Sequence, residues 1–155
     1  MKSPIWLLPI AFLTACGDNA AQISTTDPES GETTTIRAAT SEEEGIAPPD
    51  NLPAFAPIYP KAKIESTIKT GKDNQGMVTF SVNAKAGDII AFYKEKGEAA
   101  GLTSITEGNA SGSRMLMMAP ADNPNDMAMQ LTVFPRDDEG VVQQASLIYA
   151  GKATQ

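Results

Sequence analysis

The apolar and polar positions divide the chain into an apolar start, a long polar stretch and a final part with regular periodicity. In the final part, apolar residues alternate with polar ones over 62–69 and again over 78–82, which is typical of half-buried strands. The residues between these runs, 71–76, are rich in glycine, aspartate and asparagine and predict a hairpin turn. The two runs therefore predict a pair of antiparallel strands.

The period then changes, and apolar residues recur at helical spacing over 86–100. Gly97 lies on the apolar arc of this predicted helix, which indicates that the helix packs closely on a sheet. Lys96 interrupts the same arc. Its ammonium group either points into a binding cleft or reaches water while its methylenes cover the edge of the core.

Four further strands are predicted at 102–107, 113–119, 127–135 and 141–150, separated by segments with turn residues. Short connections favour antiparallel neighbours. The sequence thus predicts a two-layer α+β domain with the order ββα followed by a β-meander, in which one helix packs on one face of an antiparallel sheet. The other face is then either solvated or covered by a partner.

The polar stretch over 17–52 holds eight acidic residues and one basic residue, Arg37. Low hydrophobicity with high net charge predicts disorder, so we expect an acidic tether here. The remainder, from 53 onward, holds eleven acidic and ten basic residues, so the low isoelectric point belongs to the tether. No basic stripe is present to follow a phosphate backbone, which argues against a nucleic-acid partner.

The apolar start has the shape of a secretory signal, because Lys2 precedes a short apolar run over 4–12. It ends in Leu13-Thr14-Ala15-Cys16, which contains the single cysteine of the chain and resembles the lipobox of bacterial lipoproteins. An ordinary secreted protein with an unpaired cysteine is the alternative interpretation. The predicted organisation is a signal peptide over 1–15, a lipidated cysteine with a tether over 16–52, a single domain over 53–152 and a tail over 153–155.

The lipobox resemblance implies attachment of diacylglycerol to the Cys16 thiol, cleavage after Ala15 and acylation of the new amino terminus by a fatty acid such as palmitate. Acyl chains of this length would hold the protein on a membrane. Gly17 rather than aspartate follows the cysteine. By the same resemblance, the outer membrane, with the protein facing the periplasm, is favoured over the inner membrane.

A second resemblance covers most of 55–150. Ile58-Tyr59-Pro60-Lys61-Ala62 resembles the Tyr-Pro-Gly-Ala opening of small uncharacterised domains in proteobacterial envelope lipoproteins, with Lys61 at the position of the usual glycine. Thr79-Phe80-Ser81 and Ala91-Phe92-Tyr93-Lys94 are similar to the strand and the Phe-Tyr helix of those domains. The resemblance implies a fold and carries no known activity.

The chain lacks histidine, and its only cysteine is assigned to lipid, so imidazole and thiol chemistry are excluded. We therefore expect no enzyme activity and no cofactor. A remote alternative is Cu(I) binding by thioethers, since methionines cluster on two predicted strands; as ordinary core fillers they need no metal. They are Met115, Met117, Met118, Met127 and Met129.

Carboxylates at 137–139 and 122–126 are either solvated turns or ligands for calcium, and those at 137–139 also permit half of a glycosidase pair. Phe55, Ile58 and Tyr59 either pack on the sheet or form an apolar contact patch. The sequence favours a lipid-anchored envelope protein with a non-catalytic binding domain for an envelope partner, with Tyr59 and Lys96 as candidate binding residues. Its working surface would be the open sheet face or the loops at 108–113 and 120–126, and the alternative is a carboxylate-dependent hydrolase.

Overall fold

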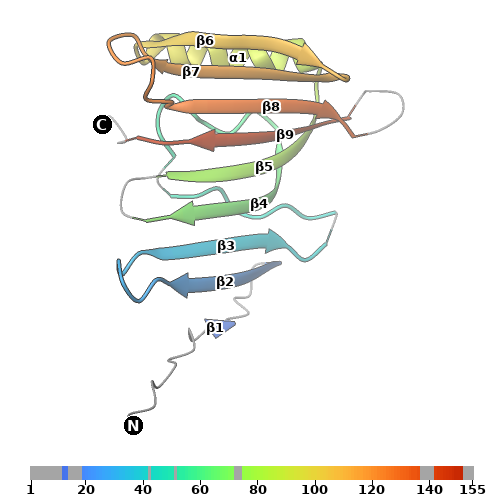
Figure 1. The fold of residues 1–155 in the computed structure, drawn as a ribbon. Coiled ribbons are helices and arrows are strands. Elements are labelled where there is room, and N and C mark those ends of the chain that lie inside the picture. The colour runs from blue at the N-terminus through green and yellow to red at the C-terminus, as the bar shows by residue number, and fades with distance from the viewer. Residues whose placement is uncertain are drawn as a thin grey trace.

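The computed structural model describes residues 12–13, 19–41, 43–50, 52–71, 75–136 and 142–151, which form nine strands and one helix (Figure 1). All nine strands join one antiparallel sheet in the spatial order β1-β2-β3-β4-β5-β9-β8-β7-β6. Helix and antiparallel sheet together make an α+β fold, as the sequence predicts. The elements are β1 (Phe12–Leu13), β2 (Ala20–Thr26), β3 (Thr33–Ala39), β4 (Lys63–Thr70), β5 (Gln75–Asn83), α1 (Ala86–Ala99), β6 (Leu102–Ala110), β7 (Ser113–Pro120), β8 (Met129–Pro135) and β9 (Val142–Tyr149).

Strands β2 and β3 correct the prediction of disorder over 16–52. They pair with each other, and β3 pairs with β4, so the sheet extends into the predicted tether. The physical reason is the threonine content of these strands, because threonine is polar in composition but β-branched and well suited to a sheet. The hairpin turn is fixed by Asp27, whose Oδ1 accepts hydrogen bonds at 2.8 Å from the backbone N–H groups of Glu29 and Ser30. Three strands also precede β4, which the predicted ββα-then-meander order does not include.

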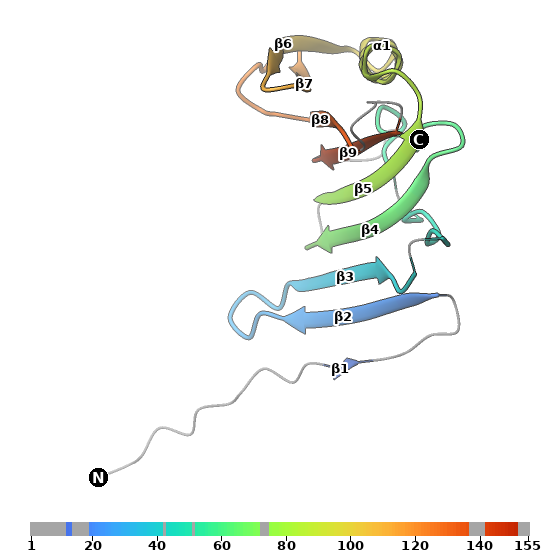
Figure 2. The ribbon, with the colours of Figure 1, turned by 90° about the vertical axis from the view of Figure 1, so that its right-hand side faces the viewer.

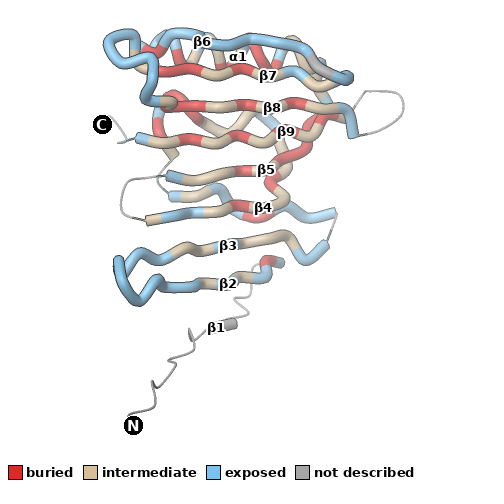
Figure 3. Tube along the Cα trace, in the orientation of Figure 1, coloured by how far each residue is buried: buried red, intermediate tan, exposed pale blue. Residues whose placement is uncertain are grey.

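One face of the sheet is covered and the other is open. Figure 2 shows α1 and the segment between β3 and β4 on the same side of the sheet, and Figure 1 looks onto the opposite side. The helix contacts β6, β7 and β8. Along β9 every second residue is buried, which marks the covered face, and Figure 3 shows the same alternation on neighbouring strands. The fully buried side chains with the largest volumes include Tyr93, Tyr149, Phe80, Ile89, Leu116, Met118, Met129, Leu131 and Leu147.

Gly97 has the role that the sequence indicates. It is buried on α1, and a Cβ atom at this position would collide with the Met118 sulfur and lie 2.8 Å from the Met118 Cε. Glycine therefore lets the helix backbone approach β7, at a loss of helix propensity of about 1 kcal/mol.

The segment that leads into β4 packs against the covered face. Phe55 is 6% exposed, while Ile58 and Tyr59 are half-buried against the core, so of the two alternatives for these residues the structure shows packing. The Tyr93 hydroxyl donates a hydrogen bond of 2.8 Å to the Pro57 carbonyl, which ties the segment to the helix. Next to it, the Ala62 N–H donates to the Tyr59 carbonyl and Lys61 has a φ of 62°, so the turn forms with lysine in the left-handed conformation that favours glycine.

The predicted loop at 108–112 is mostly strand. β6 continues to Ala110, and the hairpin turn consists of Ser111 and Gly112, both with positive φ. This is the backbone geometry that a tight two-residue hairpin requires. Among the helices of the described residues, none has the length and apolar character needed to cross a membrane.

Candidate functional site

The open face is a broad surface without charged side chains over the central part of the strands. Because side chains alternate between the two faces of a strand, the register assigns each position to one face. Positions paired with half-buried residues of β9 lie on the open face. They are mostly threonine, serine, glutamine, isoleucine and methionine, and they include Ala21, Ile23, Thr25, Thr34, Ile36, Ala38, Lys63, Ser66, Ile68, Thr70, Gln75, Met77, Thr79, Ser81, Gln144, Ser146, Ile148, Gln130, Thr132, Phe134, Met115, Met117, Thr106 and Gly108.

One row of this face forms an apolar stripe. The register aligns neighbouring strands so that one residue of each stands beside the next, in the order Ile23, Ile36, Ile68, Met77, Ile148, Gln130 and Met117. We call this row the isoleucine stripe. A hollow of ≈ 300 Å³ lies beside its middle part, lined by residues that include Ile68, Met77, Ile148 and Met127.

Arg37, Glu107 and Arg114 point to the covered side, whereas Lys63 and Glu65 of β4 lie at one end of the open face. Arg37 pairs with the buried Thr67, and Arg114 pairs with the buried Val133. Glu107 pairs with the buried Leu116, and its Oε2 lies 3.0 Å from the Lys94 Nζ of α1. This hydrogen bond with Glu107 raises the pKa of Lys94. The sheet therefore carries charges around its covered layer, and the charged residues of its open face gather at one end.

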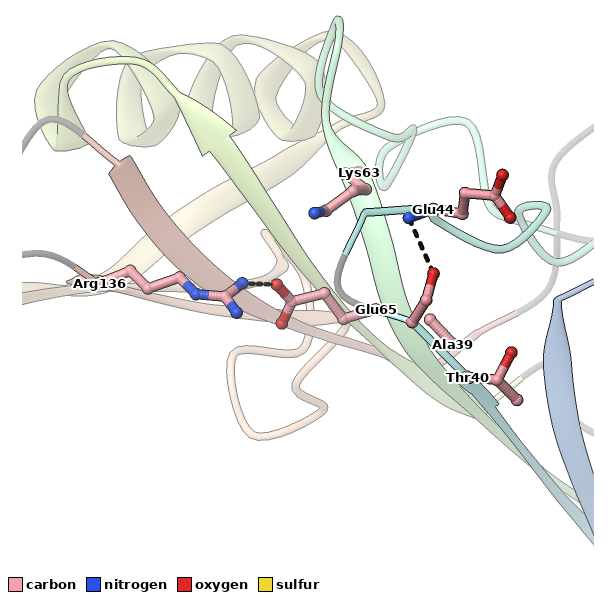
Figure 4. Close-up of a pocket in the computed structure, with 7 residues that line it drawn as sticks. Ala39, Thr40, Glu44, Lys63, Glu65 and Arg136 are labelled. Atoms are coloured by element: carbon pink, nitrogen blue, oxygen red, sulfur yellow. Dashed lines mark hydrogen bonds and ion pairs between the residues drawn. The ribbon is translucent and has the colours of Figure 1, made fainter.

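A polar pocket of ≈ 230 Å³ lies at one end of the open face (Figure 4). Its lining includes Lys63 and Glu65 of β4, Arg136 after β8 and Glu44 before β4. Arg136 forms an ion pair with Glu65, and the Gln144 Nε2 donates a hydrogen bond of 2.7 Å to the second carboxylate oxygen. Glu65 is thus held by two donors, Gln144 of β9 and Arg136 directly after β8.

The arrangement of these acids does not resemble a pair of catalytic carboxylates. The Glu44 carboxylate points away from Glu65 in Figure 4 and accepts a hydrogen bond from the Asn19 side chain. In a glycosidase-type pair, the two carboxylates face each other across the scissile bond. Among the described residues, no group of three or more acids is placed to hold a metal ion.

The two binding residues that the sequence singles out, Tyr59 and Lys96, lie on either side of Phe92. The Tyr59 and Phe92 rings meet edge to face with centroids 5.0 Å apart. The Lys96 Nζ lies 5.5 Å from the Phe92 centroid, within cation–π range. The structure therefore brings them into one aromatic cluster on α1, away from the open face.

The methionines divide between the two faces. Met118 pairs with Met129, and both side chains are fully buried on the covered face. Met115 and Met117 lie on the open face, opposite Thr132 and Gln130. The register thus places Met118, rather than Met115 or Met117, opposite Met129.

Two predicted sites, Cys16 and the acids at 137–139, lie outside the described residues. The loop at 120–126 is exposed and closed by a backbone hydrogen bond from Asn123 to Pro120, as expected of a turn. Sequence reasoning missed Ile23 and Ile36 as surface residues because it assigned them to the tether. The available signal was a turn-forming run at 27–31 flanked by β-branched residues on both sides.

Comparisons of the chain with models of protein families, with curated proteins and with solved structures found no match.

Proposed function

We propose that the protein is a lipid-anchored envelope lipoprotein whose α+β domain is a non-catalytic binding module. The observation that carries the proposal is the leader, in which a basic start and an apolar run end in the lipobox at 13–16. In this proposal Cys16 carries acyl chains and the domain faces the periplasm, with the outer membrane as the favoured anchor.

The binding role is supported by the broad open face. A sheet face that carries apolar and uncharged polar side chains, and no covering layer, is well suited to contact another surface. We propose that residues 63–149, with the order ββα followed by a meander, form the binding module, and that β2 and β3 widen its open face. Cleavage after Ala15 would remove β1 and leave β2 as the edge of the sheet.

Mass spectrometry of the protein isolated from its own membranes tests the anchor. We expect a chain that begins at Cys16 and carries a diacylglycerol group and an amide-linked fatty acid. A Cys16→Ala variant should retain its leader and gain no lipid. An unmodified thiol in a chain that keeps residues 1–15 would contradict the proposal.

The binding role requires a separate test. Membranes that hold the wild-type chain or a variant are treated with a cleavable crosslinker, and the products are identified by mass spectrometry. We expect a charge at Thr132 on the open face to remove a specific product that a Lys96→Ala change on the helix leaves in place. A product pattern unaffected by the Thr132→Lys change would reject the open face as the binding surface.

A further inference from the structure

We propose that the open face is the interface of a homodimer, in which a second copy of this chain packs its own open face against it. The two sheets would form a sandwich with the isoleucine stripes of the two copies in contact and with one α1 on each outer side. The inference rests on the binding role proposed for the open face, for which it names a second copy of this chain as the partner, and it does not depend on lipid at Cys16.

Charge favours a second copy as the occupant. The chain has a formal net charge of −7, so two copies repel each other in most orientations. Among the described residues, the charged strand residues of the open face, Lys63 and Glu65, gather at one end, where Glu65 forms an ion pair with Arg136. Arg37, Glu107 and Arg114 lie on the other side of the sheet. Two open faces can therefore bring their isoleucine stripes together without a charged residue in either row.

The isoleucine stripe is self-complementary under twofold symmetry. An isologous interface uses the same patch on both subunits. The stripe crosses the sheet from β2 to β7, so a twofold axis parallel to the stripe, or parallel to the strands through its middle, places stripe against stripe. Face-to-face sheets pack with their strands within about 30° of alignment, which keeps the two rows in contact.

The size of the open face matches what a stable dimer needs. Eight strands from β2 to β9, about 4.8 Å apart and about 25 Å long, give a face of roughly 850 Å². Standard interfaces bury about 800 Å² per partner. Two stripe residues are also unusually accessible, since Ile23 is 42% and Ile36 is 41% exposed, and burial of both would follow directly from the sandwich.

A membrane surface fits the same face less well. Faces that lie on a bilayer combine apolar residues with lysine or arginine and with tryptophan or other aromatic residues. Among the described strand residues, the register places one basic residue, Lys63 at the start of β4, and one aromatic residue, Phe134, on the open face. The uncharged threonine and serine positions around the stripe resemble the polar surroundings of a protein interface more than a lipid-binding face.

Sedimentation equilibrium of the full chain, purified in a density-matched detergent, tests the dimer. We expect a concentration-dependent mass of two chains per particle. Ile36→Lys places a charge in the stripe and should weaken the dimer by about tenfold or more, because an unpaired charge would be buried. Thr132→Lys, on the other half of the face, should have the same effect. Agreement between the two variants would exclude a local folding defect at β3 as the cause.

Ile105→Lys is the matched control. Ile105 is 39% exposed, similar to Ile36, but it lies in the edge strand β6 at a register shift and outside the stripe. This variant should sediment as the wild type does, and far-UV circular dichroism should show a folded sheet in all three variants.

Three results would overturn the inference. The first is a monomer at every concentration. The second is a dimer that Ile36→Lys and Thr132→Lys leave intact, which would place the interface elsewhere. The third is a monomer that floats with neutral phosphatidylcholine vesicles and loses this property in Ile36→Lys, which would assign the stripe to lipid.

Discussion

The covered and the open face of this sheet differ completely, although they are built from the same strands. On β9, Leu147 is fully buried beneath the helix layer, while its neighbour Ile148 is half-buried on the open side. The covered face uses large apolar side chains and leaves its charges at the margin. The open face uses short β-branched and uncharged polar side chains. The difference shows that alternate residues of each strand have different tasks. One set packs the core and stabilises the fold, and the other set is available for contact with a partner.

The largest effect should come from a matched pair of truncations on β9. Leu147→Ala should lower the free energy of unfolding by about 2–5 kcal/mol, because it leaves a cavity in the packed layer. Ile148→Ala, measured at low protein concentration, should lower the free energy of unfolding by about 1 kcal/mol or less, since the side chain is already in partial contact with water. Urea unfolding measures both. Equal losses would show that the two faces do not differ in packing.

A pair of glycines should give the next effect. A Cβ at Gly76 would lie 2.7 Å from the Ile68 carbonyl oxygen and 2.7 Å from the Tyr149 ring, so we expect Gly76→Ala to destabilise by about 2–3 kcal/mol. Gly108 on the open face has no atom within 4 Å of the corresponding position. Gly108→Ala should be neutral or stabilise by up to about 1 kcal/mol. Thermal unfolding of both variants provides the measurement, and a tolerated Gly76→Ala would contradict the close packing under Tyr149.

Two buried tyrosines of the covered layer should respond in opposite ways to loss of the hydroxyl group. Tyr93→Phe removes the hydrogen bond to Pro57 and should destabilise by about 1 kcal/mol, because a buried carbonyl loses its donor. The Tyr149 hydroxyl is buried and has no partner among the described residues. Tyr149→Phe should therefore be neutral or stabilise by up to about 1 kcal/mol. Similar losses in the two variants would indicate that Tyr149 has a donor or acceptor after all.

The smallest effect at neutral pH comes from ionisation of the same tyrosines, and it becomes measurable only in alkaline solution. Burial raises the pKa of Tyr93 and of Tyr149 above the ordinary value of 10.0. A raised pKa in the folded state means that stability is complete below the unfolded pKa and falls as the pH rises above about 10. The unfolding free energy, followed from pH 8 to pH 11, should decline from about pH 10 onward. The decline should be less steep in Tyr93→Phe. An unchanged slope would show that ionisation of the Tyr93 hydroxyl does not cause the decline.

Periodicity predicted the part of the fold where apolar and polar residues differ clearly. The helix over 86–100 and the strands from 62 onward follow from such patterns, and Gly97 predicted close helix packing. The same method failed over 20–39, because threonine and alanine carry the alternation there and their composition resembles that of a disordered tether. What stabilises these strands is pairing with β4, a long-range contact that no local pattern reports.

An open sheet face was predicted, but the isoleucine stripe on it could not be, for a related reason. The stripe joins residues from seven strands, and only the register brings Ile23, Ile68 and Met117 into one row. Two of the four isoleucines in the stripe also lie in the segment that was assigned to the tether. Tyr59 and Lys96, by contrast, were singled out from local patterns, and the structure places them together because Phe92 contacts both.

The early start of β2 limits how far the domain could stand from its anchor. Only three residues separate Cys16 from Ala20, the first residue paired with β3. A fully extended chain over these four Cα–Cα steps reaches at most about 14 Å. A lipidated chain would therefore hold its sheet just above the lipid headgroups. Lateral diffusion there confines encounters to two dimensions, which favours contact with proteins that are anchored at the same height.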